Sequence, residues 1–206
     1  HEADNHFIAE PIEKNIPIMM ALIGVWYINF FDFSTYAILP YDQCLTKLPA
    51  YLQQADMESN GKFIGRNNQK VCQKTGPILW GEAGTNGQHA FYQLLHQGTE
   101  IVPSDFIMPI NSNYSLGNDK HNHHNILQSN FIAQTQSLMM GKSKHDVESE
   151  MKNEIENNPD LKRLISHRTF EGNRPSNSIL FKSLTPKALG KLIALYEHKI
   201  FTQGII

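Results

Sequence analysis

The feature that most restricts the fold is a strand–helix–strand pattern in the middle of the chain. Residues 77–80 form a short apolar run marked off by glycine and proline, which is typical of a buried strand, and residues 86–96 have helical spacing. A second strand is predicted over 100–110. Because strands joined in this way run parallel within one sheet, the polar turn over 81–89 should lie at the carboxyl end of the first strand. Ligands bind at such ends in open α/β sheets.

The same alternation continues along the rest of the chain. Further strands are predicted over 36–41 and 177–182, and helices over 11–32, 45–57, 125–140, 144–157 and 186–203. Residues 66–70 suit a hairpin or surface loop, 111–122 a loop, and 159–168 a connecting segment. The pattern predicts an α/β fold, a three-layer sandwich around a mostly parallel, Rossmann-like sheet. A chain of 206 residues suits a single domain of this kind.

The sequence predicts how deeply three segments are buried. The helix over 11–32 is apolar nearly all round after Ile16, so we expect it inside the domain or between subunits. The helix over 144–157 is charged and has little to bury. Residues 1–10 are polar and should be peripheral.

Composition excludes several classes of partner. The formal net charge is −2 with both signs interspersed, which argues against binding to nucleic acid or to an anionic membrane. Cys44 and Cys72 form no CxxC and no secretory signal precedes them, so we expect free thiols and a cytoplasmic protein. The apolar stretch over 16–33 is interrupted by polar residues, glycine and proline, and favours a buried helix over a membrane span.

Glu58 is the first candidate catalytic residue. It follows the helix over 45–57 and precedes Ser59, Asn60 and Gly61, so its carboxylate would stand at a helix end facing a loop-lined cleft. Partial shielding from water there would raise its pKa toward neutrality, as a general base requires. The alternative is an exposed helix-end carboxylate, which is the common environment of a lone glutamate.

Two further candidates accompany Glu58. Gln54 precedes it by one helical turn, so the two side chains share a face, although a surface amide is the alternative. His89 lies near the start of the helix after the glycine-rich turn, where a structural or exposed histidine is the alternative. Residues 84–87 could cradle a phosphate at that helix start, but a plain structural turn suits them as well, and no phosphate ligand is assigned.

Two other polar groups are predicted to be structural. His121, His123 and His124 lack the spaced cysteine or carboxylate partners of a zinc site, so they are interpreted as an exposed loop and no metal is assigned. Glu171 and Arg174 are interpreted as an ion pair across a tight turn, with a role in shaping the site as the second interpretation.

Four segments closely resemble the glucose-6-phosphate isomerase (phosphoglucose isomerase) family. They are YLQQADMESNGK at 51–62, WGEAGTNGQHAFYQL at 80–94, FEGNRP at 170–175 and YEHKIF at 196–201. The likeness extends from about residue 6 to residue 206. It implies a sugar-isomerase (SIS) domain, the second of two in the family, without the first domain and the C-terminal segment of those longer proteins.

The resemblance also implies roles for the three candidates. Glu58 falls on the family's catalytic base, which carries a proton between C1 and C2 of the open-chain sugar through a cis-enediolate. His89 falls on the histidine that assists ring opening from the neighbouring subunit, and Gln54 on a glutamine that contacts the sugar. The implied activity is the reversible isomerisation of glucose 6-phosphate and fructose 6-phosphate in glycolysis and gluconeogenesis, by a homodimer that needs no cofactor.

The chain departs from the family pattern in two ways. Ala83 stands where proline is usual and Ser104 where cysteine is common, which should alter loop stiffness only. The arginine that stabilises the enediolate, the phosphate-binding Ser/Thr loops and the Phe-Asp-Gln-Trp-Gly-Val-Glu motif with its catalytic lysine have no counterpart. These 206 residues alone should therefore be nearly inactive. The rival hypothesis is a phosphosugar-binding or dimerisation module without turnover.

Overall fold

A parallel sheet forms the middle layer of the protein. The computed structural model describes residues 1–114 and 123–206. The strands are β1 (Thr35–Pro40), β2 (Ile78–Gly81), β3 (Ser104–Asn111) and β4 (Ser176–Ser183), in the order β2-β1-β3-β4. Every pairing is parallel, with Ala37 beside Trp80 of β2 and Ser104 of β3. The predicted parallel α/β architecture is confirmed, and β3 begins four residues later than the sequence suggested.

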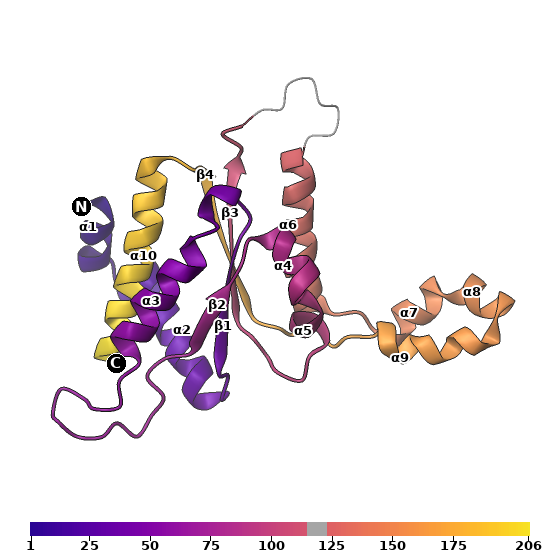
Figure 1. The fold of residues 1–206 in the computed structure, drawn as a ribbon, viewed down its shortest axis with the longest axis horizontal. Helices are drawn as coiled ribbons and strands as arrows, with labels where there is room; N and C mark the ends of the chain where they lie inside the picture. The colour runs from indigo at the N-terminus through magenta and orange to yellow at the C-terminus, as the bar shows by residue number, and fades with distance from the viewer. Residues whose placement is uncertain (115–122) are drawn as a thin grey trace.

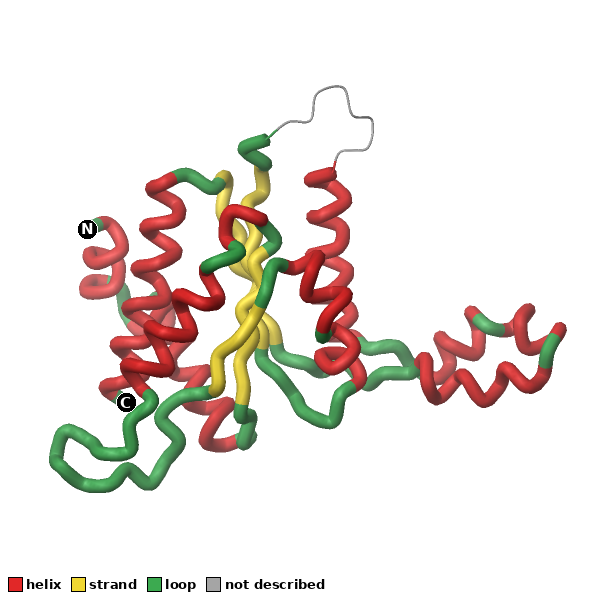
Figure 2. The backbone as a smooth tube through the Cα atoms, viewed as in Figure 1, coloured by secondary structure: helices red, strands yellow, loops and turns green. Residues whose placement is uncertain are grey.

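Helices cover both faces of the sheet (Figures 1 and 2). On one face lie α2 (Ile16–Phe30), α3 (Leu48–Asn60) and α10 (Pro186–Ile205), with α1 (Glu2–Ala9) outside them against α10. On the other face lie α4 (Gly84–Ala90), α5 (Tyr92–Gln97) and α6 (His123–Met140). The predicted three-layer sandwich is therefore confirmed. No helix in the described part of the chain is long and apolar enough to cross a membrane.

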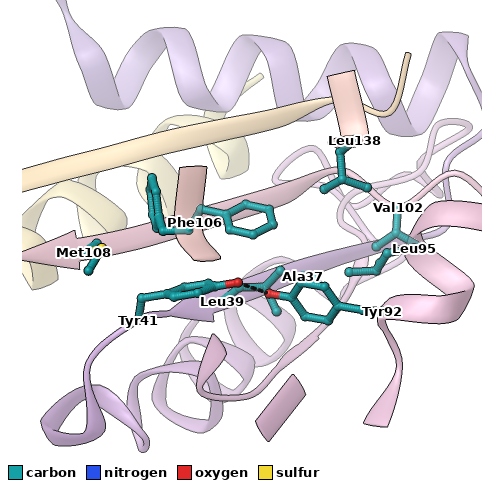
Figure 3. Close-up of a cluster of buried hydrophobic side chains, with 10 residues drawn as sticks. Ala37, Leu39, Tyr41, Tyr92, Leu95, Val102, Phe106, Met108 and Leu138 are labelled. Atoms are coloured by element: carbon teal, nitrogen blue, oxygen red, sulfur yellow. Dashed lines mark hydrogen bonds between the residues drawn. The ribbon is translucent and has the colours of Figure 1, made fainter. Parts of the chain in front are cut away.

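The face beneath α4, α5 and α6 has an aromatic core (Figure 3). Phe106 of β3 is fully buried and packs edge-on against Phe131 of α6, with ring centroids 5.9 Å apart. Tyr41, directly after β1, stacks near Phe106 and shares a 3.0 Å hydrogen bond with the hydroxyl of Tyr92. Burial raises the pKa of both tyrosine hydroxyls, so they stay protonated and available as donors.

The opposite face has an aliphatic core with a polar centre. Ile38, Leu79 and Ile107 point toward α3 and α10, because successive side chains of a strand alternate between faces. Within this layer Asp105 is 1% exposed and accepts hydrogen bonds from Tyr36 (2.7 Å), Asn177 (2.8 Å) and Tyr196 (2.7 Å). Burial raises the pKa of the Asp105 carboxyl, and the three donors act in the opposite direction. Tyr196 belongs to α10, so this cluster fastens α10 to the sheet.

The amino-terminal segment differs from the sequence prediction. The helix α1 spans Glu2–Ala9, and a 3-10 turn at Ile12–Lys14 precedes α2, so the single helix expected over 11–32 is wrong. Asn15 joins α1 to α2 by donating to the carbonyl of Phe7 at 2.8 Å. Of the two places expected for this helix, inside the domain or between subunits, full enclosure within the domain is wrong, since Trp26 is 50% and Phe30 78% exposed. A place between subunits stays a prediction.

Two other elements are broken into shorter pieces than predicted. The helix expected over 86–96 is divided into α4 and α5 at Phe91, whose φ of −143° is not helical. The helix expected over 45–57 begins with a 3-10 turn at Gln43–Leu45 and continues as α3 to Asn60. The surface loop predicted over 66–70 is confirmed, with an antiparallel bridge between Ile64 and Lys70.

A helical arm projects away from the sheet (Figure 1). It contains α7 (Lys144–Glu150), α8 (Lys152–Asn157), a 3-10 helix (Pro159–Leu164) and α9 (Ile165–Arg168). The expectations of one solvated helix over 144–157 and a plain connection over 159–168 are therefore wrong. Val147, Met151 and Ile165 form a small buried cluster of their own, which holds the arm together. The chain enters and leaves the arm through the bridge between Lys142 and Phe170.

Candidate functional site

Glu58 lies in the last turn of α3 with its side chain exposed. Asp56 and Asn60 on either side of it are buried and point toward α10. Because two residues turn an α-helix by roughly 200°, the residue between two inward positions points outward. The predicted shielding of Glu58 by a loop-lined cleft is therefore not present among the described residues, and its carboxylate faces solvent.

Gln54 lies beside Glu58 on the same face of α3, as the one-turn spacing predicts. Its Nε2 donates to Oε2 of Glu58 at 3.3 Å. This distance is at the long end for a hydrogen bond, so both groups keep most of their capacity to bind another molecule. The pair offers an acceptor of protons and an amide that can orient hydroxyl groups.

The end of α3 beyond Glu58 is closed by Lys62. Its ammonium group donates to the carbonyl of Glu58 at 2.8 Å and to that of Ser59 at 2.7 Å. A cation there complements the negative end of the helix dipole and satisfies carbonyls that lack partners within the helix. Lys62 therefore fixes the backbone on the C-terminal side of Glu58.

His89 lies in α4, on the segment that follows β2. The strand ends at Gly81 and the helix begins at Gly84, which confirms the place of the predicted turn between strand and helix. Its predicted extent over 81–89 is wrong, because residues 84–90 are helical. Because α4 is short, His89 lies in its last turn and not near the start of a long helix, and it is exposed. Its neighbour Gln88 donates to the hydroxyl of Tyr41 at 3.0 Å, which anchors α4 to the aromatic core.

Close packing accounts for the glycines of this turn. A Cβ on Gly84 would lie 2.3 Å from the ring of Tyr41, and one on Gly87 would lie 2.9 Å from the ring of Phe91. Both glycines are buried, while Thr85 and Asn86 between them are exposed. The structural interpretation of residues 84–87 explains the two glycines without a ligand.

The sheet separates Glu58 from His89 within one chain. The helix that carries Glu58 packs on β1 and β2 in the layer of Ile38 and Leu79, whereas α4 packs on the side of Tyr41 (Figure 1). Gln54 and Glu58 are thus brought together, and His89 is not brought to them.

Two cavities of the described chain are lined by other residues. One of about 710 Å³ lies between α6 and β4, and one of about 790 Å³ lies between the end of α3, the loop after it and the end of α10. Neither lining includes Gln54, Glu58 or His89.

The histidine-rich segment is partly helical. His121 lies outside the described residues, while His123 and His124 begin α6 and do not lie in the predicted loop. The ring Nε2 of His124 lies 2.8 Å from the carbonyl oxygen of Ile110. No group of three or more potential metal ligands occurs among the residues that the structure describes.

Arg174 does not form the predicted pair with Glu171 in the described structure. Its guanidinium donates to the carbonyls of Glu100 and Gly98, each at 2.7 Å. Arg174 therefore fastens the segment after the arm to the loop that precedes β3. The two cysteines, Cys44 and Cys72, are exposed free thiols, as expected.

Sequence reasoning missed the buried polar cluster beneath Glu58. Asp56 is 1% and Lys199 9% exposed, and they form an ion pair between α3 and α10 at 2.6 Å. The available signal was a charged residue at a core-facing position of each helix. Lys199 follows Tyr196 by three residues and precedes Gln203 by four, which places all three on one face of α10.

The fold and the candidate residues define a parallel, Rossmann-like α/β protein with a carboxylate–amide pair at a helix end. The chain belongs to the phosphoglucose isomerase family, whose model matches residues 1–206. It is similar to the crystal structure of a glucose-6-phosphate isomerase from Chlamydia trachomatis, with a TM-score of 0.83 and 35% identity. A hypothetical protein from Thermus thermophilus shares the fold, with a TM-score of 0.67, 16% identity and coverage of 98% of this chain and 42% of that one.

The comparison also gives the extent of the match. Alignment with the Chlamydia trachomatis enzyme covers 98% of this chain and 36% of that enzyme. The chain therefore spans little more than a third of the length of that enzyme.

The close packing of α4 on Tyr41 gives a prediction for stability. Gly84→Ala should lower the free energy of unfolding by about 1–3 kcal/mol, because the new methyl group overlaps a ring that is buried and cannot move aside. Gly190→Ala is the matched control, since Gly190 is exposed within α10 and no atom lies within 4 Å of its Cβ position. That change should raise the free energy of unfolding by about 0.5–1 kcal/mol. Denaturant unfolding measures both, and equal effects would contradict the packing argument.

Proposed function

We propose that the protein containing this chain interconverts glucose 6-phosphate and fructose 6-phosphate. The observation that carries the proposal is the exposed Gln54–Glu58 pair in a segment that matches the phosphoglucose isomerase family. The 35% identity to a glucose-6-phosphate isomerase, over 98% of this chain, supports it.

Glu58 would act as the carrier of the transferred proton. Its carboxylate removes the proton from C2 of the open-chain aldose, giving a cis-enediolate, and returns a proton to C1 while the proton of the O2 hydroxyl moves to O1, giving the ketose. The reaction in the other direction uses the same group in reverse, and no electrons are gained or lost overall. A carboxylate suits this task because it both accepts and returns the proton. Gln54 would hold a hydroxyl group of the sugar beside it.

His89 would assist opening of the sugar ring in the site of a second subunit. An imidazole can give a proton to the ring oxygen or take one from the adjacent hydroxyl near neutral pH. The helix α4, which carries His89, lies across the sheet from α3, which carries Glu58 (Figure 1). This arrangement supports a role for His89 in a different site from that of the Glu58 in its own chain. We therefore propose a symmetric homodimer in which each site combines residues of both subunits. The two exposed free thiols fit the proposed cytoplasmic location.

The first test is isomerase activity of the protein as its gene encodes it, with Glu58→Gln as the variant. Removing the base should lower kcat by about a hundredfold to ten-thousandfold, because that is the usual contribution of general acid–base catalysis. Glu13→Gln, at an exposed carboxylate in the 3-10 turn before α2, is the control and should leave kcat unchanged. A coupled assay with fructose 6-phosphate measures both.

Two results would overturn this assignment. Full activity in Glu58→Gln would remove Glu58 from the chemistry. A rise in melting temperature with fructose 6-phosphate, without any turnover by the unmodified protein, would support a binding module in place of an enzyme.

The second test asks whether His89 acts across the dimer. Glu58→Gln and His89→Ala proteins, each poorly active alone, should regain about a quarter of the unmodified activity when they are mixed in equal amounts and allowed to exchange subunits. Half of the resulting dimers are mixed, and each of these has one intact site if the two residues come from different chains. A mixture that stays as inactive as its components, while mass spectrometry detects mixed dimers, would place both residues in the same chain's site.

A further inference from the structure

A buried polar cluster joins the end of α3 to α10. Its centre is Asp56, whose carboxylate Oδ2 accepts from the ammonium group of Lys199 at 2.6 Å. The other oxygen of Asp56 accepts from Gln203 at 3.0 Å and from Asn60 at 3.2 Å. All four residues are less than a tenth exposed.

The cluster holds three separate segments of the chain. Gln203 accepts from Lys199 at 2.6 Å and donates to the carbonyl of Thr75 at 2.9 Å, which fixes the loop leading to β2. Asn60 donates to the carbonyl of Ile200 at 3.1 Å. The last turn of α3 is therefore bonded to α10 at two positions, four residues apart.

The packing around these groups leaves little freedom. A Cβ on Gly76 would lie 3.0 Å from Nε2 of Gln203, and a Cβ on Gly204 would lie 2.7 Å from Oδ1 of Asn60. The glycines allow the backbone to approach the polar side chains closely. The cluster is thus a packed unit and not a solvated patch of charge.

Glu58 lies between the two bonded positions, on the opposite side of the helix. Asp56 and Asn60 fix the backbone on either side of it, and Lys62 caps the C-terminal end of the helix by donating to the carbonyl of Glu58. The Glu58 side chain itself has few contacts, so its place is set by the backbone on which it stands.

We infer that Lys199 and Asp56 are positioning residues for Glu58: their ion pair holds the last turn of α3 so that the Glu58 carboxylate meets the substrate carbon in the reactive geometry. The inference rests on the proposed function. Neither residue is exposed to touch a substrate, since the pair is buried beneath the helix. The simple alternative is that the pair contributes only to the stability of the fold.

The pair's energetics make the two roles separable. Removing one partner of a buried ion pair leaves an uncompensated charge and is strongly destabilising, whereas replacing both partners by uncharged groups of similar shape is often nearly neutral. Lys199→Met should therefore lower the melting temperature markedly. The double variant Asp56→Asn with Lys199→Met should recover most of that loss, while the tie between Lys199 and Asp56 stays broken.

The kinetic test uses the double variant in the protein as its gene encodes it. A small displacement of a catalytic group costs up to about a hundredfold in rate, so kcat should fall by about tenfold to a hundredfold. KM for fructose 6-phosphate should change by less than about threefold, because substrate contacts are kept and the loss is confined to the transition state. Lys191→Met is the matched control, since this exposed lysine of α10 pairs with Glu2 and not with α3. It should leave both constants unchanged.

A second measurement does not depend on turnover. Hydrogen exchange of the amides at 57–62 should speed up on the order of tenfold in the double variant, while amides in the first turns of α3 keep their wild-type rates. Exchange in Lys191→Met should match that of the unmodified protein.

The outcomes separate the inference from the function on which it rests. A double variant whose kcat recovers together with its melting temperature, or whose exchange at 57–62 is unchanged, overturns the positioning role. Normal activity in Glu58→Gln, with faster exchange at 57–62 in the double variant, would overturn the proposed chemistry and leave the mechanical tie between α3 and α10 supported.

Discussion

Burial of the strands β1 and β3 on both faces is the constraint on which the rest of the structure depends. Ala37 and Leu39 face one layer of helices, and Ile38 faces the other, all without exposed area. Strands buried in this way need helices on both sides. The helix that carries Glu58 and the helix that carries His89 therefore lie in different layers of the chain.

The two helix layers are held by different physical means. Aromatic rings fill the space beneath α4, α5 and α6, with the hydroxyl pair of Tyr41 and Tyr92 inside it. The other layer adds two buried carboxylates to its aliphatic packing: Asp105 fastens α10 to the sheet, and Asp56 fastens α3 to α10. Directional bonds of this kind fix the orientation of helices where hydrophobic contacts alone would allow sliding. The sheet thus holds α10, α10 holds α3, and the last turn of α3 carries Glu58.

The alternation of apolar runs and helical spacing was enough to predict the parallel sheet, its layers and the turn before His89, because these follow from local periodicity. The arm was not predictable in the same way. Val147 lies in α7, Met151 between α7 and α8, and Ile165 in α9, so no single helix carries all the buried residues of the arm. The pairing of Asp56 with Lys199 depends on how α3 docks on α10, which no local pattern contains.

The most direct test of the account is a crystal structure of the protein, as its gene encodes it, with a bound phosphosugar analogue of the enediolate. The account predicts that Glu58 of one subunit and His89 of the partner subunit both lie within about 3 Å of the same ligand. It also predicts that the ion pair between Asp56 and Lys199 is intact beneath that Glu58. A ligand held by Glu58 and His89 of the same chain, or bound away from both, would contradict it.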